Sequence, residues 1–82
     1  MHEYSLVQAM FDQIGEAVRA NRALAVRRVY VRIGRYAGVE PELFRTAYEV
    51  FRVKTMCADA PLEIADAPDD ELLLERLELE VP

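Results

Sequence analysis

The spacing of the apolar residues most constrains the fold of this chain, because it changes between helical and strand periods along the sequence. Residues 5–21 repeat apolar side chains at intervals of three and four, which predicts an amphipathic helix. Residues 26–36 alternate apolar and polar side chains, which predicts a strand. Glu40-Pro41 then opens a second helix, with proline at its first position. The expected buried residues are Leu6, Val7, Met10, Phe11, Ile14, Ala17 and Val18 in the first helix, Val29, Val31 and Ile33 in the strand, and Phe44, Ala47, Tyr48 and Phe51 in the second helix.

Two further strands are expected after a loop at residues 54–60. Residues 62–64 form a short strand, and residues 72–81 form a final one with Leu73, Leu77, Leu79 and Val81 on one face. The order is α-β-α-β-β, in which the first two strands and the helix between them can form a right-handed parallel crossover. We therefore expect an α+β, two-layer domain over residues 1–82, with two helices on one face of a three-stranded mixed sheet.

Composition excludes several classes of function. The net charge of −5 argues against nucleic acid as the main partner. No apolar run approaches the ~20 residues of a membrane span, so no membrane partner is expected. The start of the chain lacks the basic region and apolar core of a signal peptide, so we expect a cytoplasmic protein. The single cysteine, Cys57, excludes an internal disulfide and a cysteine-based zinc cage, and a small, partly buried loop residue is its expected role.

The start of the chain carries a candidate metal site. His2 is the only histidine, and it lies one residue from a terminal amine. Because His2 is bulky, Met1 should be retained with its amine free. An amine, one or two backbone amides and an imidazole then lie within reach of one ion, a nitrogen-rich set that suits Ni(II) or Cu(II). The competing interpretation is that a lone terminal histidine binds nothing.

The capping pattern bears on this site. Ser5 and Gln8 resemble a capping box, with Ser5 as the N-cap of the first helix. The amides of His2 and Glu3 would then precede the helix without backbone acceptors. Asn21 is the expected left-handed residue at the end of this helix. Glu40, at the start of the second helix, could approach His2 if both helices begin at the same end of the layer.

Other charged groups support no reaction. Four arginines, at positions 27, 28, 32 and 35, form either a basic patch for an acidic partner or, the preferred interpretation, a solvated face that balances the acidic last third of the chain. Glu3 and Glu40 could form a carboxylate pair, but nothing else in the sequence builds a substrate pocket around them. We therefore expect a protein that is not an enzyme.

Three segments carry a resemblance to a known family. They are MHEYSL at the start, VYVRIGRYAGVEPELFRTAYEVF in the middle, and ADAPLEIAD followed by ELLLERLELEV at the end. With these segments the chain resembles the HypA-type nickel metallochaperones of [NiFe]-hydrogenase and urease maturation. The resemblance implies a nickel site centred on His2, with the backbone nitrogens of Met1, His2 and Glu3. It adds an acidic side chain at the position of Glu40, which is aspartate in some members of the family.

The resemblance also implies two partners, and it shows that one module of the family is missing from this sequence. The implied partners are a GTPase that inserts nickel and a hydrogenase large subunit. The family carries a zinc ribbon between its last two strands, whereas here that segment shrinks to residues 67–71, so no structural zinc is expected. The alternative is a metal-independent adaptor that kept the fold after the ribbon was lost.

The short segment at 67–71 also bears on oligomeric state. If the last two strands are neighbours, it is a hairpin loop of ordinary length and the chain closes as a monomer, the preferred case. If the final strand pairs beside the first strand instead, the link is short, and a strand-swapped dimer becomes possible.

Overall fold

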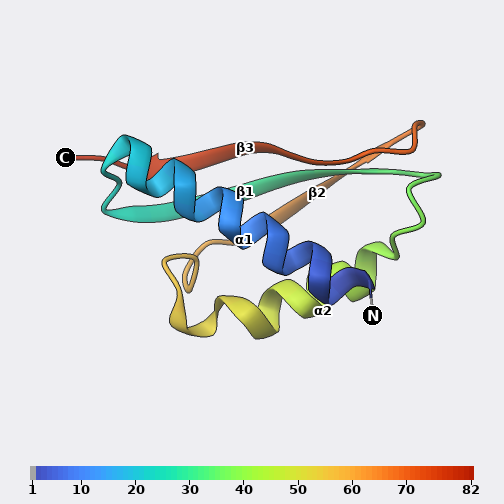
Figure 1. Cartoon of the computed structure of the whole chain (residues 1–82), viewed down its shortest axis with the longest axis horizontal. Coiled ribbons are helices and arrows are strands. Elements are labelled where there is room, and N and C mark those ends of the chain that lie inside the picture. Colours follow the sequence, from blue (N-terminus) through green and yellow to red (C-terminus); the bar gives the residue numbers. More distant parts are fainter. Residues whose placement is uncertain (1) are drawn as a thin grey trace.

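The elements follow the expected order, α-β-α-β-β, in a computed structural model that describes residues 2–82 apart from the side chain of His2. Both helices lie on the same side of the sheet (Figure 1), so the expected two-layer α+β architecture is confirmed. The elements are α1 (His2–Asn21), β1 (Ala25–Gly34), α2 (Pro41–Phe51), the 3-10 turn η1 (Arg52–Lys54), β2 (Leu62–Ala67) and β3 (Leu72–Glu80).

The first helix starts earlier than expected and ends differently. It begins at His2, so Ser5 lies inside the helix and the predicted N-cap at Ser5 is wrong. An acidic residue, Glu3, occupies the first turn, where the helix dipole favours negative charge. At the other end, the left-handed residue is Arg22, with φ 52°, and not Asn21. The Asn21 amide instead donates a 2.8 Å hydrogen bond to the carbonyl of Ala17.

The sheet is mixed, with β1 in the centre. Strand β2 runs parallel to β1, with Val29 opposite Leu62, and β3 runs antiparallel to β1, with Val29 opposite Leu77. The preferred expectation that the last two strands are neighbours is therefore wrong, because they flank β1 in the order β2-β1-β3. Parallel β1 and β2 are joined through α2, as the crossover pattern predicted.

The link between β2 and β3 must therefore pass over the end of β1. Five Cα–Cα steps reach roughly 16–18 Å, and two neighbouring strand spacings total only about 9–10 Å. The link is held by backbone bonds from Gly34 N to the Glu71 carbonyl (2.7 Å) and from Tyr36 N to the Asp69 carbonyl (2.9 Å). Within the described chain, positive φ values occur only at Arg22 and Gly38, so the short link is not strained.

The prediction of which side chains of the final strand face the core is partly wrong. Leu73 is 46% exposed and Val81 lies beyond the strand, 53% exposed, so neither faces the core as expected. The half-buried residues that pack on the core are Leu72, Leu74, Leu77 and Leu79. The reason is a register shift opposite Tyr30 and Val31, which reverses the alternation halfway along β3.

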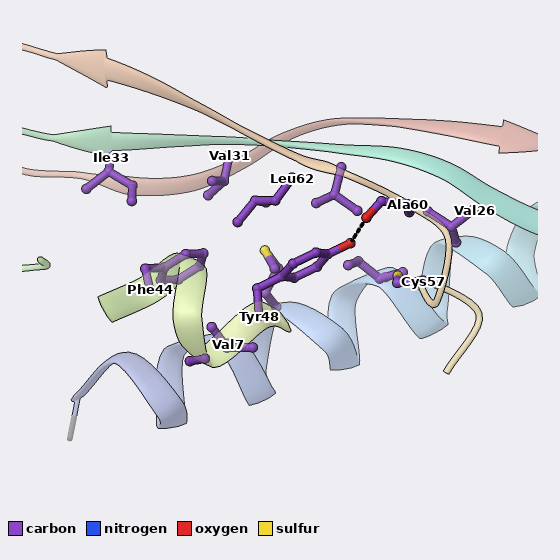
Figure 2. Packing of buried hydrophobic residues seen from close by; sticks show 13 residues of the cluster. Val7, Val26, Val31, Ile33, Phe44, Tyr48, Cys57, Ala60 and Leu62 are labelled. Atoms are coloured by element: carbon purple, nitrogen blue, oxygen red, sulfur yellow. Dashed lines mark hydrogen bonds between the residues drawn. The ribbon is translucent and has the colours of Figure 1, made fainter. Parts of the chain in front are cut away.

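The core lies between the sheet and the two helices. Its largest fully buried side chain is Tyr48, whose hydroxyl donates a 2.6 Å hydrogen bond to the carbonyl of Ala60 (Figure 2). Phe44, from the same helix, packs under the sheet near Ile33 (Figure 2). Cys57 is also buried, in agreement with its expected structural role. Of the helices in the described chain, none combines the length and apolar character needed to span a membrane.

Candidate metal centre

The backbone at the start of α1 presents nitrogens that the helix does not use. The helix begins at His2, and the first four N–H groups of any helix lack a partner within it. The amides of His2 and Glu3 belong to this first turn. These are the two amides that the sequence predicted as metal donors, and they lie in the first turn of α1 and not before it.

Glu3 is the residue that ties this turn to the rest of the fold. Its side chain is only 7% exposed, and its Oε2 accepts a 3.1 Å hydrogen bond from the backbone N–H of Glu40. This bond, and a second one from the amide of Glu3 itself, lower the pKa of the carboxyl group below its ordinary value of 4.5, against the opposing effect of burial. Glu3 therefore carries its charge near neutral pH.

Glu40 holds the start of α2. Its backbone is extended, with φ −86° and ψ 113°, and its carboxylate accepts a 2.9 Å hydrogen bond from the N–H of Glu42. Its carbonyl receives the first helical hydrogen bond, from Phe44 N at 2.9 Å. Pro41 follows at the first helical position, as expected. Glutamate is a weak N-cap by residue type, but here it caps the helix.

The two helices therefore begin at the same end of the molecule, the condition that the sequence left open. The 3.1 Å bond joins Glu3 to the backbone of Glu40, although the Glu40 carboxylate itself turns toward its own helix. Met1 lies outside the described residues, and so does the side chain of His2. Sequence reasoning named both Glu3 and Glu40 but missed the bond between them, because no local pattern reports which amide a distant carboxylate will reach.

The metal site predicted at this end uses nitrogen donors. Within residues 3–82 no three histidine, cysteine, aspartate or glutamate side chains gather to hold an ion. Burial raises the pKa of the Cys57 thiol, which keeps it protonated and unsuited to binding metal. The donors that the sequence predicts, the amine of Met1, the imidazole of His2 and the neighbouring amides, would form a set that suits Ni(II) or Cu(II).

The arginines of β1, and Arg35 directly after it, do not form a free basic patch. Arg28 lies 2.8 Å from Glu63 and 3.6 Å from Glu78, and Arg32 lies 2.6 Å from Asp69. Arg27 pairs with Glu80, and Arg35 with Asp66 at 3.3 Å. The uncovered face of the sheet is thus neutralised by its own ion pairs, which agrees with the preferred interpretation of a solvated face.

A groove between α1 and the segment at residues 51–57 lies apart from the candidate centre. It has a volume of about 680 Å³, and its lining includes Phe11, Phe51, Met56 and Cys57, but neither Glu3 nor Glu40. The two carboxylates that could have formed a catalytic pair therefore do not share this groove.

Comparisons with known proteins all point to one family. Residues 1–70 match the family described as "Hydrogenase/urease nickel incorporation, metallochaperone, hypA". The match ends inside the link between β2 and β3. Among curated proteins, a hydrogenase maturation factor HypA of Shewanella sp. (strain MR-7) is 43% identical over 68 residues, which cover 83% of this chain and 58% of that protein. The chain thus spans little more than half the length of this relative.

Other relatives and solved structures agree. The HypA of Shewanella oneidensis is 38% identical over 85 residues, covering 93% of this chain and 72% of that protein. The solution structure of the Ni metallochaperone HypA from Helicobacter pylori superimposes with a TM-score of 0.87 at 25% identity, covering 98% of each chain. A second solution structure, of a HypA protein, gives a TM-score of 0.78 at 27% identity.

Proposed function

The chain belongs to the HypA family of nickel-incorporation metallochaperones, and from this membership we propose that it binds Ni(II) at its N-terminus and delivers it to a maturing nickel enzyme such as a [NiFe]-hydrogenase. The ion is cargo and the protein is not an enzyme. The terminal amine of Met1, the imidazole of His2 and the amide nitrogens of His2 and Glu3 would hold it. Glu40 would border the ion from the start of α2.

The observation that carries this proposal is the 3.1 Å bond from the Glu40 amide to the Glu3 carboxylate. It keeps the first turn of α1 beside the start of α2, so the backbone amides of His2 and Glu3 belong to a helix that is tied to the rest of the fold. A fixed donor set loses less conformational entropy on binding than a frayed terminus does. The positive end of the helix dipole also favours amides that have lost their protons to a metal.

The proposed partners follow from the family and not from the geometry. They are a GTPase that inserts nickel and a hydrogenase large subunit that receives it, both in the cytoplasm. We also propose that residues 1–82 form a single nickel-binding domain. The segment at residues 67–71 would stand where family members carry a zinc ribbon, since the family match ends within it.

Calorimetry with untagged protein tests the nickel site. The native protein should bind one Ni(II), and an extension of a few residues before Met1 should weaken binding at least about tenfold, because the amine is lost as a ligand. His2→Ala should abolish the site. Equal affinity in the native and extended proteins would contradict the amine as a ligand.

A second readout concerns protons. Binding to an imidazole and to deprotonated amides must release protons, so the heat should differ between two buffers of different ionisation enthalpy at pH ~7. Carboxylate ligands are already ionised there and would release almost none. No nickel binding at all by the untagged protein would favour the second candidate function, a metal-independent adaptor that uses the same fold for protein contacts.

A further inference from the structure

Among residues 3–82, Glu3 is the only charged residue that is buried, with 7% of its surface exposed. A carboxylate taken out of water is unfavourable unless hydrogen bonds replace its hydration. Here the replacement includes the N–H of Glu40, 37 positions away in the sequence. A specific long-range contact therefore helps to hold the Glu3 carboxylate in place.

The carboxylates of Glu3 and Glu40 make two consecutive hydrogen bonds at this end of the molecule. Glu3 accepts from the amide of Glu40 at 3.1 Å, and Glu40 accepts from the amide of Glu42 at 2.9 Å. Each is thus bound to a backbone N–H at the start of α2. We call the Glu3–Glu40 contact the tether, because it joins the first turn of α1 to the residue that precedes α2.

We infer that Glu3 is a positioning residue for nickel: its carboxylate, through the tether, fixes the backbone nitrogens that bind the ion and does not itself bind the ion. This inference rests on the proposed function. Consecutive backbone nitrogens bind one ion with less loss of conformational entropy when the torsion angles between them are already held, and a helix terminus is otherwise the part of a helix that frays. Groups that orient metal ligands typically change affinity by about 10–100-fold.

The first comparison separates positioning from ligation at Glu3. Glu3→Ala removes the acceptor and should weaken Ni(II) binding by about 10–100-fold. Glu3→Gln keeps an oxygen that can accept the Glu40 N–H, so it should restore most of that loss. Glu16→Ala removes an exposed carboxylate from the same helix and should bind nickel as the native protein does. The visible absorption bands of bound nickel should keep their wavelengths in all three variants, since the ligand set does not change.

The second comparison changes the donor of the tether, which is the backbone N–H of Glu40. Glu40→Ala removes only what the Glu40 carboxylate contributes, whereas Glu40→Pro also removes the N–H. Proline can be accommodated at this position, because the residue precedes the helix and its φ of −86° lies only a few degrees beyond the range that the ring imposes. Glu40→Pro should bind nickel about tenfold more weakly than Glu40→Ala. Adding Glu3→Ala to Glu40→Pro should cause little further loss, because the tether is already broken.

Hydrogen exchange reports the tether without metal. The Glu40 amide should exchange faster in Glu3→Ala than in the native protein, while the core amides of β1 keep their protection. Nickel binding to Glu3→Ala with native affinity would overturn the inference. It would also be overturned if Glu3→Gln lost as much affinity as Glu3→Ala and shifted the nickel bands, since that result makes the carboxylate a ligand. Failure of the native protein to bind nickel would instead contradict the proposed function.

Discussion

At the scale of single residues, Tyr48 of α2 connects α1 with the segment that precedes β2. Its ring stacks on Phe11 of α1 at 5.7 Å, and its hydroxyl donates to the Ala60 carbonyl ahead of β2. Burial raises the pKa of Tyr48 well above its ordinary value of 10.0, and the neighbouring Cys57 adds to this. The phenol must therefore stay protonated in the folded state.

We expect Tyr48→Phe to lower the free energy of unfolding by about 1 kcal/mol near neutral pH, because the hydrogen bond to Ala60 is lost. The loss is moderate because Arg52 also donates to this carbonyl, at 3.2 Å. A raised folded-state pKa gives stability that is complete below pH 10.0 and is lost as pH rises toward the folded-state value. Urea unfolding should therefore show a smaller decline above pH 10.0 in the variant than in the native protein.

Cys57→Ala is the control for this pH dependence, because burial also raises the pKa of the Cys57 thiol from 9.0. The part of the alkaline decline that begins near pH 9.0 should disappear in that variant. Identical pH profiles for Tyr48→Phe and the native protein would contradict the role given to the phenol.

At the scale of elements, the link between β2 and β3 explains why the last residue of β1, Gly34, is a glycine. A Cβ atom on Gly34 would overlap the carbonyl of Asp69, with the carbonyl carbon only 2.7 Å away. Asp69 also pairs with Arg32 and accepts from the N–H of Glu71 at 3.2 Å. The link is thus packed directly on the end of β1, and only glycine leaves room for it.

Gly34→Ala should therefore lower the free energy of unfolding by about 1–3 kcal/mol, as overpacking against backbone does. Gly15→Ala is the matched control. Its new Cβ would meet only the end of the flexible Arg19 side chain at 3.4 Å, in the middle of α1. Alanine favours the helix by up to about 1 kcal/mol over glycine there, so the control should be stabilised. Chemical unfolding measures both, and a neutral Gly34→Ala would show that the link does not pack on β1.

At the scale of the whole molecule, the sheet is completed within one chain. Strand β3 pairs with β1 over residues 72–80, and the core closes between one sheet and two helices, with overall extents of 39 × 22 × 17 Å. Within residues 3–82 the core contains no cluster of side chains suited to a structural metal. The described core is formed by apolar side chains of the two helices and the sheet.

We accordingly predict that the purified protein is monomeric and contains no stoichiometric zinc. A strong chelator should leave its melting temperature unchanged, because a structural zinc site takes four ligands and only one cysteine is present. Light scattering and metal analysis are the measurements. A strand-swapped dimer in solution, or a melting temperature that falls sharply in chelator, would contradict this view of the fold.

Sequence periodicity determined the elements of this protein and their two-layer arrangement, because helical and strand spacings are local properties of the chain. Local residue types also determined the start of α2, where Glu40 caps the helix and Pro41 takes its first position. Tertiary structure decided what depends on distant partners. The place of β3 beside β1, the outward turn of Leu73 and the bond from Glu40 to Glu3 each join segments far apart in sequence. Such contacts form only when packing brings those segments together, so no local pattern could have fixed them.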